Sequence, residues 1–543
     1  MSHGKNWWVV AAVAVLWFTF LGVRDLRDSD EGRYAEISRE MVASGDWLTP
    51  RLNGYKYLEK PPLQYWGTAL IFSAFDESNL TARLWVALIG FLGGLWTWFV
   101  GHRLFGAQQG LFAFLILMSS FLYMASGHFV TLDMTVSVFM AVAVGALALA
   151  QSRREDRSHV RRWMLLGWGA LGLAVLTKGL MGVVLPGAAA FLYMLWQRDW
   201  VLLRHLHLGA GLAVFLLVTA PWFVAVSFAN PEFPSFFFIH EHLQRYTTDF
   251  HRRDEPFYYL LPVLLVGALP WLVAVVRGIL RSQFDWWPKE TRGFDAERLL
   301  WAYAIFIVLF FSLSHSKLPP YILPAFPALA PLAGRHLADR THFRAESATL
   351  AILGVLLLLA APVFFFLPPT LDRTPVELVS GLWPWLAGAG AILLIGAIAV
   401  SRVRSATLSV GAASISAIAM LQVVAVGSGP IERLRSNGQL AGAIQAVATP
   451  DTEIFSVGLF EPSLTFYLGR TVTLVQRQGE LAFGIAQEPR DSIADLGAFR
   501  ERWEATQRGV AVLRVGYSDD PSLADLGGRV IYKDPRKIAI ARP

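Results

Sequence analysis

Apolar runs long enough, or nearly long enough, to cross a bilayer recur along most of this chain and restrict its fold more than any other feature. Hydrophobic residues make up 55% of the 543 positions, with 20 Trp and 37 Phe. A soluble protein does not contain so many such runs, so we predict an all-α polytopic membrane protein. We expect about thirteen spans, near 7–23, 82–100, 109–126, 134–151, 163–177, 180–196, 208–228, 258–276, 299–314, 321–333, 348–366, 384–400 and 406–427.

The basic residues of the connecting loops indicate an orientation. Lys and Arg favour the cytoplasmic side of short loops, and with the N-terminus inside they divide eighteen to six in favour of that side after the first loop. The first loop departs from the rule with seven basic residues, which eight acidic ones accompany. The net charge of +6 therefore indicates orientation and not nucleic acid binding. The first apolar run lacks a small-residue cleavage site, so we expect a retained span and not a removed signal peptide.

The chain changes character after about residue 428. Residues 1–428 are expected to form the transmembrane domain, and an odd number of spans places residues 429–543 outside the cytoplasm. In that tail a helix is predicted over Glu432 to Val447, and strands are predicted at 454–457, 510–515 and 538–541. We interpret the tail as a small α/β domain.

The first outer loop, residues 24–65, holds much of the charge of the chain. Apolar residues at helical spacing opposite a charged face predict an amphipathic helix over Glu31 to Ser44, which Gly45 ends. Asp30 precedes this helix, where capping alone could explain a carboxylate. The loop ends in Glu59-Lys60 and a Pro-Pro pair that fixes the local geometry.

Charged residues at the edge of a membrane are functional candidates, and here they lie in the outer loops. Asp133 stands alone between two apolar spans, and the alternative to a functional role is a helix N-cap. Lys178 occupies a tight turn, where its alternative is an ammonium that reaches the lipid headgroups. Five outer loops could thus converge on one cavity.

A phosphate site is the most direct use of the cations in these loops. Lys60, Arg245 and Lys317 could hold a phosphate through one guanidinium fork and two point charges, and contact with anionic headgroups is the alternative. Glu59 and His240 can both ligate a divalent metal, but no spacing rule joins them. The chain has no cysteine, which excludes disulfides and thiolate chemistry.

Several of these residues belong to longer motifs, which are Asp30-Glu31-Gly32-Arg33-Tyr34-Ala35-Glu36-Ile37, Ser44-Gly45-Asp46-Trp47, Arg51-Leu52-Asn53-Gly54, Tyr57-Leu58-Glu59-Lys60-Pro61-Pro62-Leu63 and Ser316-Lys317-Leu318-Pro319-Pro320-Tyr321-Ile322-Leu323-Pro324. These motifs resemble those of a known family, the bacterial lipid A aminoarabinose transferases. Members of that family are membrane glycosyltransferases of the C-type fold and relatives of the protein O-mannosyltransferases. One departure is Gly32, where proline is commoner in the family.

The resemblance implies transfer of 4-amino-4-deoxy-L-arabinose from undecaprenyl phosphate to a lipid A phosphate. This would occur at the periplasmic face of a Gram-negative inner membrane, with resistance to polymyxin and other cationic peptides as the result. Asp30 and Asp133 are then the expected catalytic residues, with Tyr321 added to the phosphate site of Lys60, Arg245 and Lys317. The remaining polar residues are expected to bind substrate: Glu31, Arg33, Tyr34, Tyr57, Glu59, Lys178 and His240.

The chemistry expected of this site needs no cofactor, and a divalent metal at Glu59 and His240 is only an additional hypothesis. A polyprenyl donor brings its own phosphate leaving group, and the chain shows no nucleotide-binding fingerprint. We expect a monomer in the membrane with the lipid-linked donor and lipid A as its partners. A protein O-mannosyltransferase-like enzyme is the alternative within this class. A lipid or sugar flippase is the alternative from another class, although one-sided charge argues against it.

Overall fold

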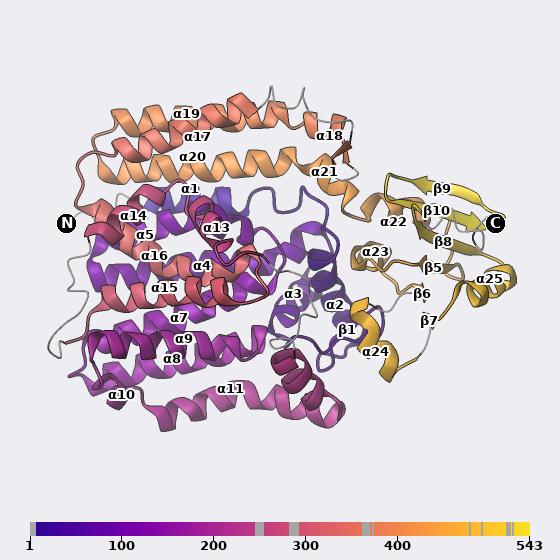
Figure 1. Cartoon of the computed structure of the whole chain (residues 1–543), viewed down its shortest axis with the longest axis horizontal. Helices are drawn as coiled ribbons and strands as arrows, with labels where there is room; N and C mark the ends of the chain where they lie inside the picture. The colour runs from indigo at the N-terminus through magenta and orange to yellow at the C-terminus, as the bar shows by residue number, and fades with distance from the viewer. Residues whose placement is uncertain are drawn as a thin grey trace.

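The protein is an elongated molecule with a bundle of helices at one end and a small α/β domain at the other (Figure 1). The elements of the first outer loop lie between the two parts. The structure, a computed structural model, describes residues 7–542 except 245–254, 282–292, 361–369, 372–373, 477–478, 490–491, 517–522 and 524–525.

The bundle consists of apolar helices that lie roughly along the long axis of the molecule. Its main helices are α1 (Trp7–Phe18), α4 (Asn79–Phe105), α5 (Ala107–Ser119), α6 (Phe121–Gly127), α7 (Leu132–Ser152), α8 (Arg157–Lys178), α9 (Met181–Gln197), α11 (Leu208–Ala229), α13 (Leu260–Gly267), α14 (Leu272–Arg281), α15 (Ala296–Leu313), α16 (Phe326–Ala338), α17 (Arg344–Ala360), α19 (Trp383–Arg402) and α20 (Ala406–Gly427). Shorter elements complete it: α10 (Leu202–His205), the π-helix η1 (Ser235–Gln244), the 3-10 helix η2 (Pro319–Ala325), the β3 and β4 strands (Thr370–Leu371 and Thr374–Pro375), α18 (Val376–Ser380) and α21 (Gly429–Leu434).

Six helices in the described part of the chain are long and apolar enough to cross a membrane. The number rises to eight if two bent pairs each count as one span, α5 with α6 at 66° and α13 with α14 at 108°. The apolar helices α1 and α9 are shorter than this test requires. The fold is therefore that of a multi-span helical membrane protein, and the count of thirteen stays a prediction.

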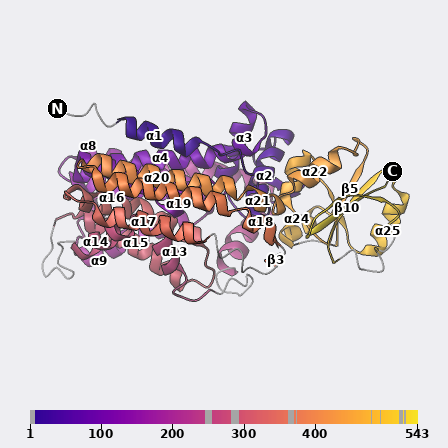
Figure 2. The ribbon, with the colours of Figure 1, turned by 90° about the horizontal axis from the view of Figure 1, so that it is seen from above.

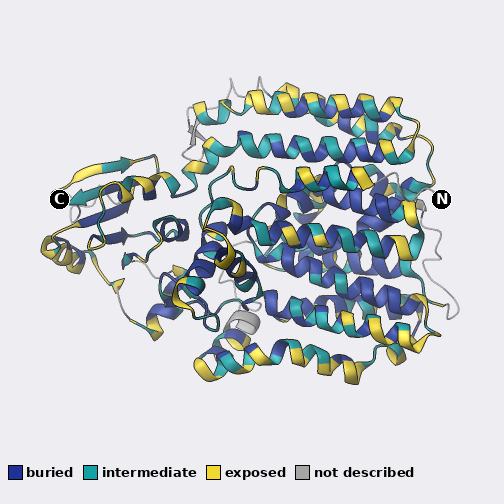
Figure 3. Ribbon diagram, turned by 180° about the vertical axis from the view of Figure 1, so that it is seen from behind, coloured by how far each residue is buried: buried dark blue, intermediate teal, exposed yellow. Residues whose placement is uncertain are grey.

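Burial separates the central helices from those that face outward (Figure 3). In α7, 83% of the most apolar stretch is buried inside the protein, whereas in α11 only 17% is. Small residues permit the close packing of the central helices: a Cβ added at Gly93 in α4 would lie 2.5 Å from Val138 Cγ2 in α7. The exposed apolar side chains of α11 are those expected to contact lipid.

The first outer loop folds as its pattern predicts. The α2 helix spans Asp30–Ser44, and Gly45 ends it with φ 71° in the left-handed region. The β1 and β2 strands, Arg51–Leu52 and Tyr55–Lys56, form a hairpin whose turn residues Asn53 and Gly54 also have positive φ. The short helix α3, Leu63–Ala74, follows the Pro-Pro pair.

The C-terminal domain is built on a six-stranded mixed sheet of order β7-β6-β5-β8-β10-β9. The first four strands in that order run parallel, with helices in their connections, and the last two form antiparallel pairs. Its elements are α22 (Gly438–Gln445), β5 (Glu453–Val457), α23 (Pro462–Leu468), β6 (Thr473–Val475), η4 (Gly479–Leu481), α24 (Ala482–Gln487), β7 (Ser492–Ile493), α25 (Leu496–Ala505), β8 (Gly509–Arg514), β9 (Arg529–Lys533) and β10 (Lys537–Arg542).

One predicted element of the tail was wrong. The helix expected over Glu432 to Val447 is divided into α21 and α22, with a break near Asn437. Asn437 is fully buried, and its amide bonds Ser463 Oγ at 2.8 Å and Lys537 Nζ at 2.7 Å. These tertiary bonds hold the break in place. The β5, β8 and β10 strands lie where apolar runs predict strands.

The C-terminal domain packs directly against the first loop, next to α2 (Figure 2). Asn53 exchanges two hydrogen bonds with the Val472 backbone, at 2.9 and 2.8 Å. Gly32 faces Ser463 so closely that an added Cβ would lie 2.5 Å from the Ser463 nitrogen. Glycine at this position is therefore required by the contact between the two parts of the chain.

Candidate active site

Three of the predicted site residues, each from a different outer loop, meet at Lys178. The Lys178 ammonium bonds the Asp133 carboxylate, and it lies 4.8 Å from the centre of the Tyr321 ring. Tyr321 in turn packs on Phe311, with ring centres 5.0 Å apart. The ends of α7, α8 and the η2 segment thus place a carboxylate, an ammonium and an aromatic face together.

The two alternative roles, a helix N-cap for Asp133 and headgroup contact for Lys178, do not fit this arrangement. Thr131 occupies the N-cap position of α7, so Asp133 lies inside the first turn. The side chains of Lys178 and Asp133 are 13% and 14% exposed and form an ion pair, so the Lys178 ammonium does not extend freely to headgroups. Their pairing leaves a locally neutral unit at the edge of the bundle.

A second group of charges lies at the start of α2. Asp30 is the first residue of this helix and Ser29 is its N-cap, so a capping role does not explain Asp30. Arg33 Nη1 lies 3.5 Å from Asp30 Oδ1, and Arg33 Nη2 lies 2.6 Å from Glu480 Oε2. The Arg33 guanidinium therefore joins a carboxylate of the first loop to one of the C-terminal domain. Half of the Asp30 side-chain surface is exposed, so a substrate can reach it.

Buried tyrosines lie beside the charges at the start of α2, where the Arg33 guanidinium lies 5.9 Å from the centre of the Tyr34 ring. Tyr34 is 8% exposed and its ring centre lies 6.0 Å from that of Tyr65, while Tyr57 is 2% exposed. Burial raises the pKa of Tyr34, Arg33 lowers it, and the carboxylates of Asp30, Asp133 and Glu59 raise it further. The predicted substrate-binding residues Tyr34 and Tyr57 are thus both buried in the first loop.

The cations expected to bind the donor phosphate are held by backbone oxygens. Lys60 Nζ donates to the Glu59 carbonyl at 3.0 Å, and Lys317 Nζ donates to the Glu255 carbonyl at 2.8 Å. Lys317 is 6% exposed. A phosphate bound here would form charge-assisted hydrogen bonds with these ammonium groups. Arg245 lies outside the described residues.

Glu31 was expected to bind substrate, and this expectation needs correction. Its side chain is fully buried, Oε1 accepts from Arg83 Nε and Oε2 from Arg83 Nη2, each at 2.8 Å. The Val130 and Arg27 backbone nitrogens donate to the same carboxylate. A carboxylate with both oxygens bonded and no exposed surface does not contact a substrate in this conformation. Glu31 instead ties the first loop to α4 and to the second outer loop.

The metal hypothesis stays a prediction. Within the described residues, no three His, Asp or Glu side chains gather closely enough to hold a metal ion. His240 belongs to the η1 helix, but its side chain is outside the described part of the chain. Glu59 is therefore the one proposed ligand whose surroundings are described.

Glu480 is the site residue that the sequence analysis missed. It follows Gly479 in a short 3-10 helix of the C-terminal domain, about 450 residues from Arg33, and no local pattern marks it. Burial raises its pKa, which Arg33 opposes, and Glu59 and Asp30 raise it further. The available signal was Gly32, because a glycine inside the amphipathic helix indicates the close approach of another segment.

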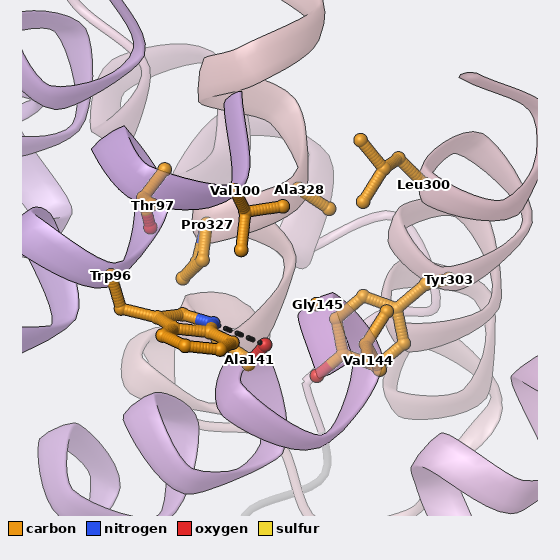
Figure 4. Close-up of a pocket in the computed structure, with 10 residues that line it drawn as sticks. All are labelled: Trp96, Thr97, Val100, Ala141, Val144, Gly145, Leu300, Tyr303, Pro327 and Ala328. Carbon is orange, nitrogen blue, oxygen red and sulfur yellow. Dashed lines mark hydrogen bonds between the residues drawn. The ribbon is translucent and has the colours of Figure 1, made fainter. Parts of the chain in front are cut away.

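A small cavity inside the bundle differs from the charged groups above in having an uncharged lining (Figure 4). It lies between α4, α7, α15 and α16, and Trp96 Nε1 donates to the Ala141 carbonyl beside it at 3.1 Å. No charged side chain lines it; its residues are Trp96, Thr97, Val100, Ala141, Val144, Gly145, Leu300, Tyr303, Pro327 and Ala328. We therefore assign no phosphate or sugar to this cavity.

Comparisons with known proteins agree with the resemblance read from the motifs. The family described as "Aminoarabinose transferase C-terminal domain" matches residues 440–542, and the family described as "Dolichyl-phosphate-mannose-protein mannosyltransferase" matches residues 59–224. The undecaprenyl phosphate-alpha-4-amino-4-deoxy-L-arabinose arabinosyl transferase of Erwinia tasmaniensis is 30% identical over 531 residues, covering 93% of this chain and 92% of that protein. The protein of the same name from Edwardsiella ictaluri is 35% identical, over 63% of this chain and 61% of its own length, which is less than two thirds.

Solved structures extend the comparison to the whole fold. The crystal structure of ArnT from Cupriavidus metallidurans bound to undecaprenyl phosphate is 36% identical, with a TM-score of 0.92. It covers 100% of this chain and 98% of its own. An oligosaccharyltransferase from Archaeoglobus fulgidus is 12% identical with a TM-score of 0.52, which is a likeness of fold alone.

Proposed function

The chain belongs to the undecaprenyl phosphate-aminoarabinose arabinosyl transferase family, and on this premise we propose that it transfers 4-amino-4-deoxy-L-arabinose from undecaprenyl phosphate to a lipid A phosphate. The reaction would take place at the periplasmic face of a Gram-negative inner membrane. The thirteen spans, the periplasmic C-terminal domain and the monomeric state are parts of this proposal. Masking of lipid A charge would make the cell resistant to polymyxin.

The observation that carries the proposal is the meeting of Asp133, Lys178 and Tyr321 at the end of the bundle that carries the first loop and Asp30. A sugar linked to a polyprenyl phosphate has a polar head and an apolar tail. The head fits a charged site at the membrane edge, and the tail fits between apolar helices. A site at this depth suits a lipid-linked donor better than a soluble one.

The reaction is a single displacement at the anomeric carbon. An oxygen of the lipid A phosphate attacks C1 of the sugar, the bond from C1 to the donor phosphate oxygen breaks, and undecaprenyl phosphate leaves with the electron pair. Lys60, Arg245 and Lys317 would stabilise the negative charge of the leaving phosphate. Tyr321, against which Lys178 packs, forms an edge of the same region. The anomeric configuration is inverted because the two oxygens lie on opposite faces of the sugar.

Asp30 and Asp133 would act on the sugar and not as bases. The second ionisation of a phosphate monoester lies near pH 6, so the acceptor is already largely an anionic nucleophile at neutral pH. A carboxylate beside the sugar ring then stabilises the positive charge that develops at C1. Lys178 would keep the Asp133 carboxylate in place through their ion pair.

The test uses purified enzyme with several undecaprenyl-phosphate sugars and lipid A. The 4-amino-4-deoxy-L-arabinose donor should give modified lipid A with a much higher kcat/KM than donors that carry other sugars. Lys60→Ala should weaken donor binding by about ten- to a hundredfold, the loss expected for one charge-assisted contact. Lys56→Ala is the matched control, since Lys56 lies in the same loop but pairs with Glu232 at 2.7 Å. Equal donor affinity in Lys60→Ala and the wild type would contradict the phosphate site.

A protein O-mannosyltransferase-like activity is the second candidate, favoured by the match of residues 59–224 to that family. A Ser or Thr hydroxyl is a poor nucleophile and requires a general base, so one Asp would then be indispensable as a base. Transfer of sugar to a Ser- and Thr-containing peptide in place of lipid A would establish this alternative.

A further inference from the structure

Glu480 reaches the candidate site from the C-terminal domain. Its Oε2 atom lies 2.6 Å from Arg33 Nη2, and one quarter of its side-chain surface is exposed. A bound molecule can therefore contact this carboxylate. The partner that holds it, Arg33, also lies 3.5 Å from Asp30 in the same helix.

Carboxylates outnumber cations around Arg33. Burial raises the pKa of Glu480, and the charges coupled to it are Arg33, Glu59 and Asp30. Two carboxylates, Asp30 and Glu480, thus share the Arg33 guanidinium, and the residual charge of this group is negative. Lys178 pairs with Asp133, and Lys317 bonds a carbonyl. The site therefore has a negative wall formed by Asp30 and Glu480.

Two polar atoms beside this negative wall lack a hydrogen-bond partner among the described residues: the Tyr65 hydroxyl and Arg33 Nε. Tyr65 is fully buried at the start of α3. The centre of the Tyr65 ring lies 6.0 Å from that of Tyr34, which is the residue next to Arg33 in α2. Buried polar atoms are nearly always paired, so these two atoms are available to bond a polar ligand.

A 4-amino sugar matches this arrangement. Its ammonium group supplies the positive charge that the negative wall lacks, and its hydroxyls can bond both a tyrosine hydroxyl and a guanidinium N–H. A neutral sugar of the same size would leave the excess negative charge uncompensated. The arrangement therefore favours an aminosugar over a neutral sugar of the same size.

We propose that Glu480 recognises the ammonium group of the donor sugar, so that the C-terminal domain determines which sugar the enzyme accepts. This inference rests on the proposed function, and it assigns a specificity-determining role to a residue outside the membrane domain. Arg33 holds the Glu480 carboxylate through their ion pair, and Asp30 lies beside the same guanidinium.

The test compares two donors on the purified full-length enzyme: the undecaprenyl-phosphate aminosugar with a free amine, and its N-formylated form, which carries no charge. Glu480→Gln should lower kcat/KM for the charged donor by about tenfold or more, because an amide accepts hydrogen bonds but carries no charge. It should change kcat/KM for the formylated donor by less than about twofold, so the ratio of the two values falls.

Glu488→Gln is the matched control. Glu488 lies in the same domain and pairs with Arg51 of the first loop at 2.7 Å, so its loss weakens the domain contact in a similar way. This variant should keep the wild-type ratio. Equal losses for both donors in Glu480→Gln, or no loss for either, would overturn the inference.

The failure of this inference is distinct from failure of the proposed function. If the wild type transfers neither sugar to lipid A, the proposed function is wrong; if it transfers the charged sugar and Glu480→Gln keeps the ratio, only the role of Glu480 is wrong. If Glu480→Gln does not fold, Glu480→Asp replaces it: the shorter carboxylate should lower the ratio by about threefold. An unchanged ratio in Glu480→Asp would then overturn the inference.

Discussion

Glu31 and Arg83 form a two-point ion pair in which both side chains are fully buried. Arg83 Nε donates to Glu31 Oε1 and Nη2 donates to Oε2, each at 2.8 Å. Arg83 also donates to the backbone carbonyls of Leu21 and Arg24. Burial would raise the pKa of Glu31, but Arg83 outweighs it and the pKa is lowered. The pair fixes the residue that follows Asp30, and so it sets where the candidate catalytic carboxylate stands.

Removal of one partner should therefore destabilise the protein. Glu31→Gln leaves the Arg83 charge buried and only partly compensated, which costs on the order of 3–5 kcal/mol. Thermal unfolding in detergent should show a lower melting temperature for this variant. Glu504→Gln is the control, because Glu504 pairs with Arg500 on the surface, where both side chains are largely exposed. A melting temperature for Glu31→Gln equal to that of the control would contradict the structural role.

The buried pair Glu36 and Glu40 predicts a pH dependence of stability. Burial raises the pKa of Glu40 to about 8, with the Glu36 carboxylate as the second cause. A raised folded pKa means that the contribution of Glu40 is complete below its unfolded value of 4.5 and is lost as the pH rises through about 8. The melting temperature should therefore fall as the pH rises through this window.

The variant Glu40→Gln separates the pH dependence that Glu40 causes from the pH dependence that Asp28 causes. Burial raises the pKa of Asp28 to about 7, so its contribution is mostly lost by pH 7. The fall in melting temperature between pH 7 and 8 should thus be smaller in Glu40→Gln than in the wild type. The same fall in both proteins would show that Glu40 is already ionised.

Asp30→Asn and Asp133→Asn should each abolish most activity while the protein stays folded. Asparagine keeps the volume and removes the charge that stabilises the sugar. Loss of about 3 kcal/mol of stabilisation would reduce kcat/KM by about a hundredfold. Circular dichroism and unfolding of the purified variants check the fold. Full activity in both variants would mean that neither carboxylate acts on the sugar.

The reaction should follow the ionisation of the acceptor phosphate. We expect the rate to rise through about pH 6 without a separate limb from an Asp that acts as a base. The product should carry the inverted anomeric configuration, which NMR of the modified lipid A reports. A retained configuration, or a sugar trapped on either Asp, would instead require a covalent intermediate.

The topology predicts opposite compartments for two serines. Under the orientation with the N-terminus inside, Ser158 lies at the cytoplasmic start of α8, and Ser463 lies in the periplasmic C-terminal domain. Reporter fusions at these positions should be active in the cytoplasm and in the periplasm respectively. Activity of both in one compartment would contradict the odd number of spans.

The sequence by itself determined the class of the protein and the local form of the first loop. Long apolar runs can satisfy their backbone in lipid only as helices, so composition predicts a helical membrane protein without any tertiary information. The period of Tyr34, Ile37 and Met41, followed by Gly45, predicts α2 nearly to the residue. Such signals are local because helix hydrogen bonds and caps join residues close in sequence.

Only the tertiary structure decided which charged residues meet. Lys178 could have reached the headgroups, and Glu31 could have contacted a substrate; their partners Asp133 and Arg83 lie 45 and 52 residues away. Glu480 had no sequence signal, since its role depends on the docking of a domain near the other end of the chain against α2. Ion pairs between distant segments form because the fold brings them together and burial strengthens them, so their identity is a property of the packed molecule.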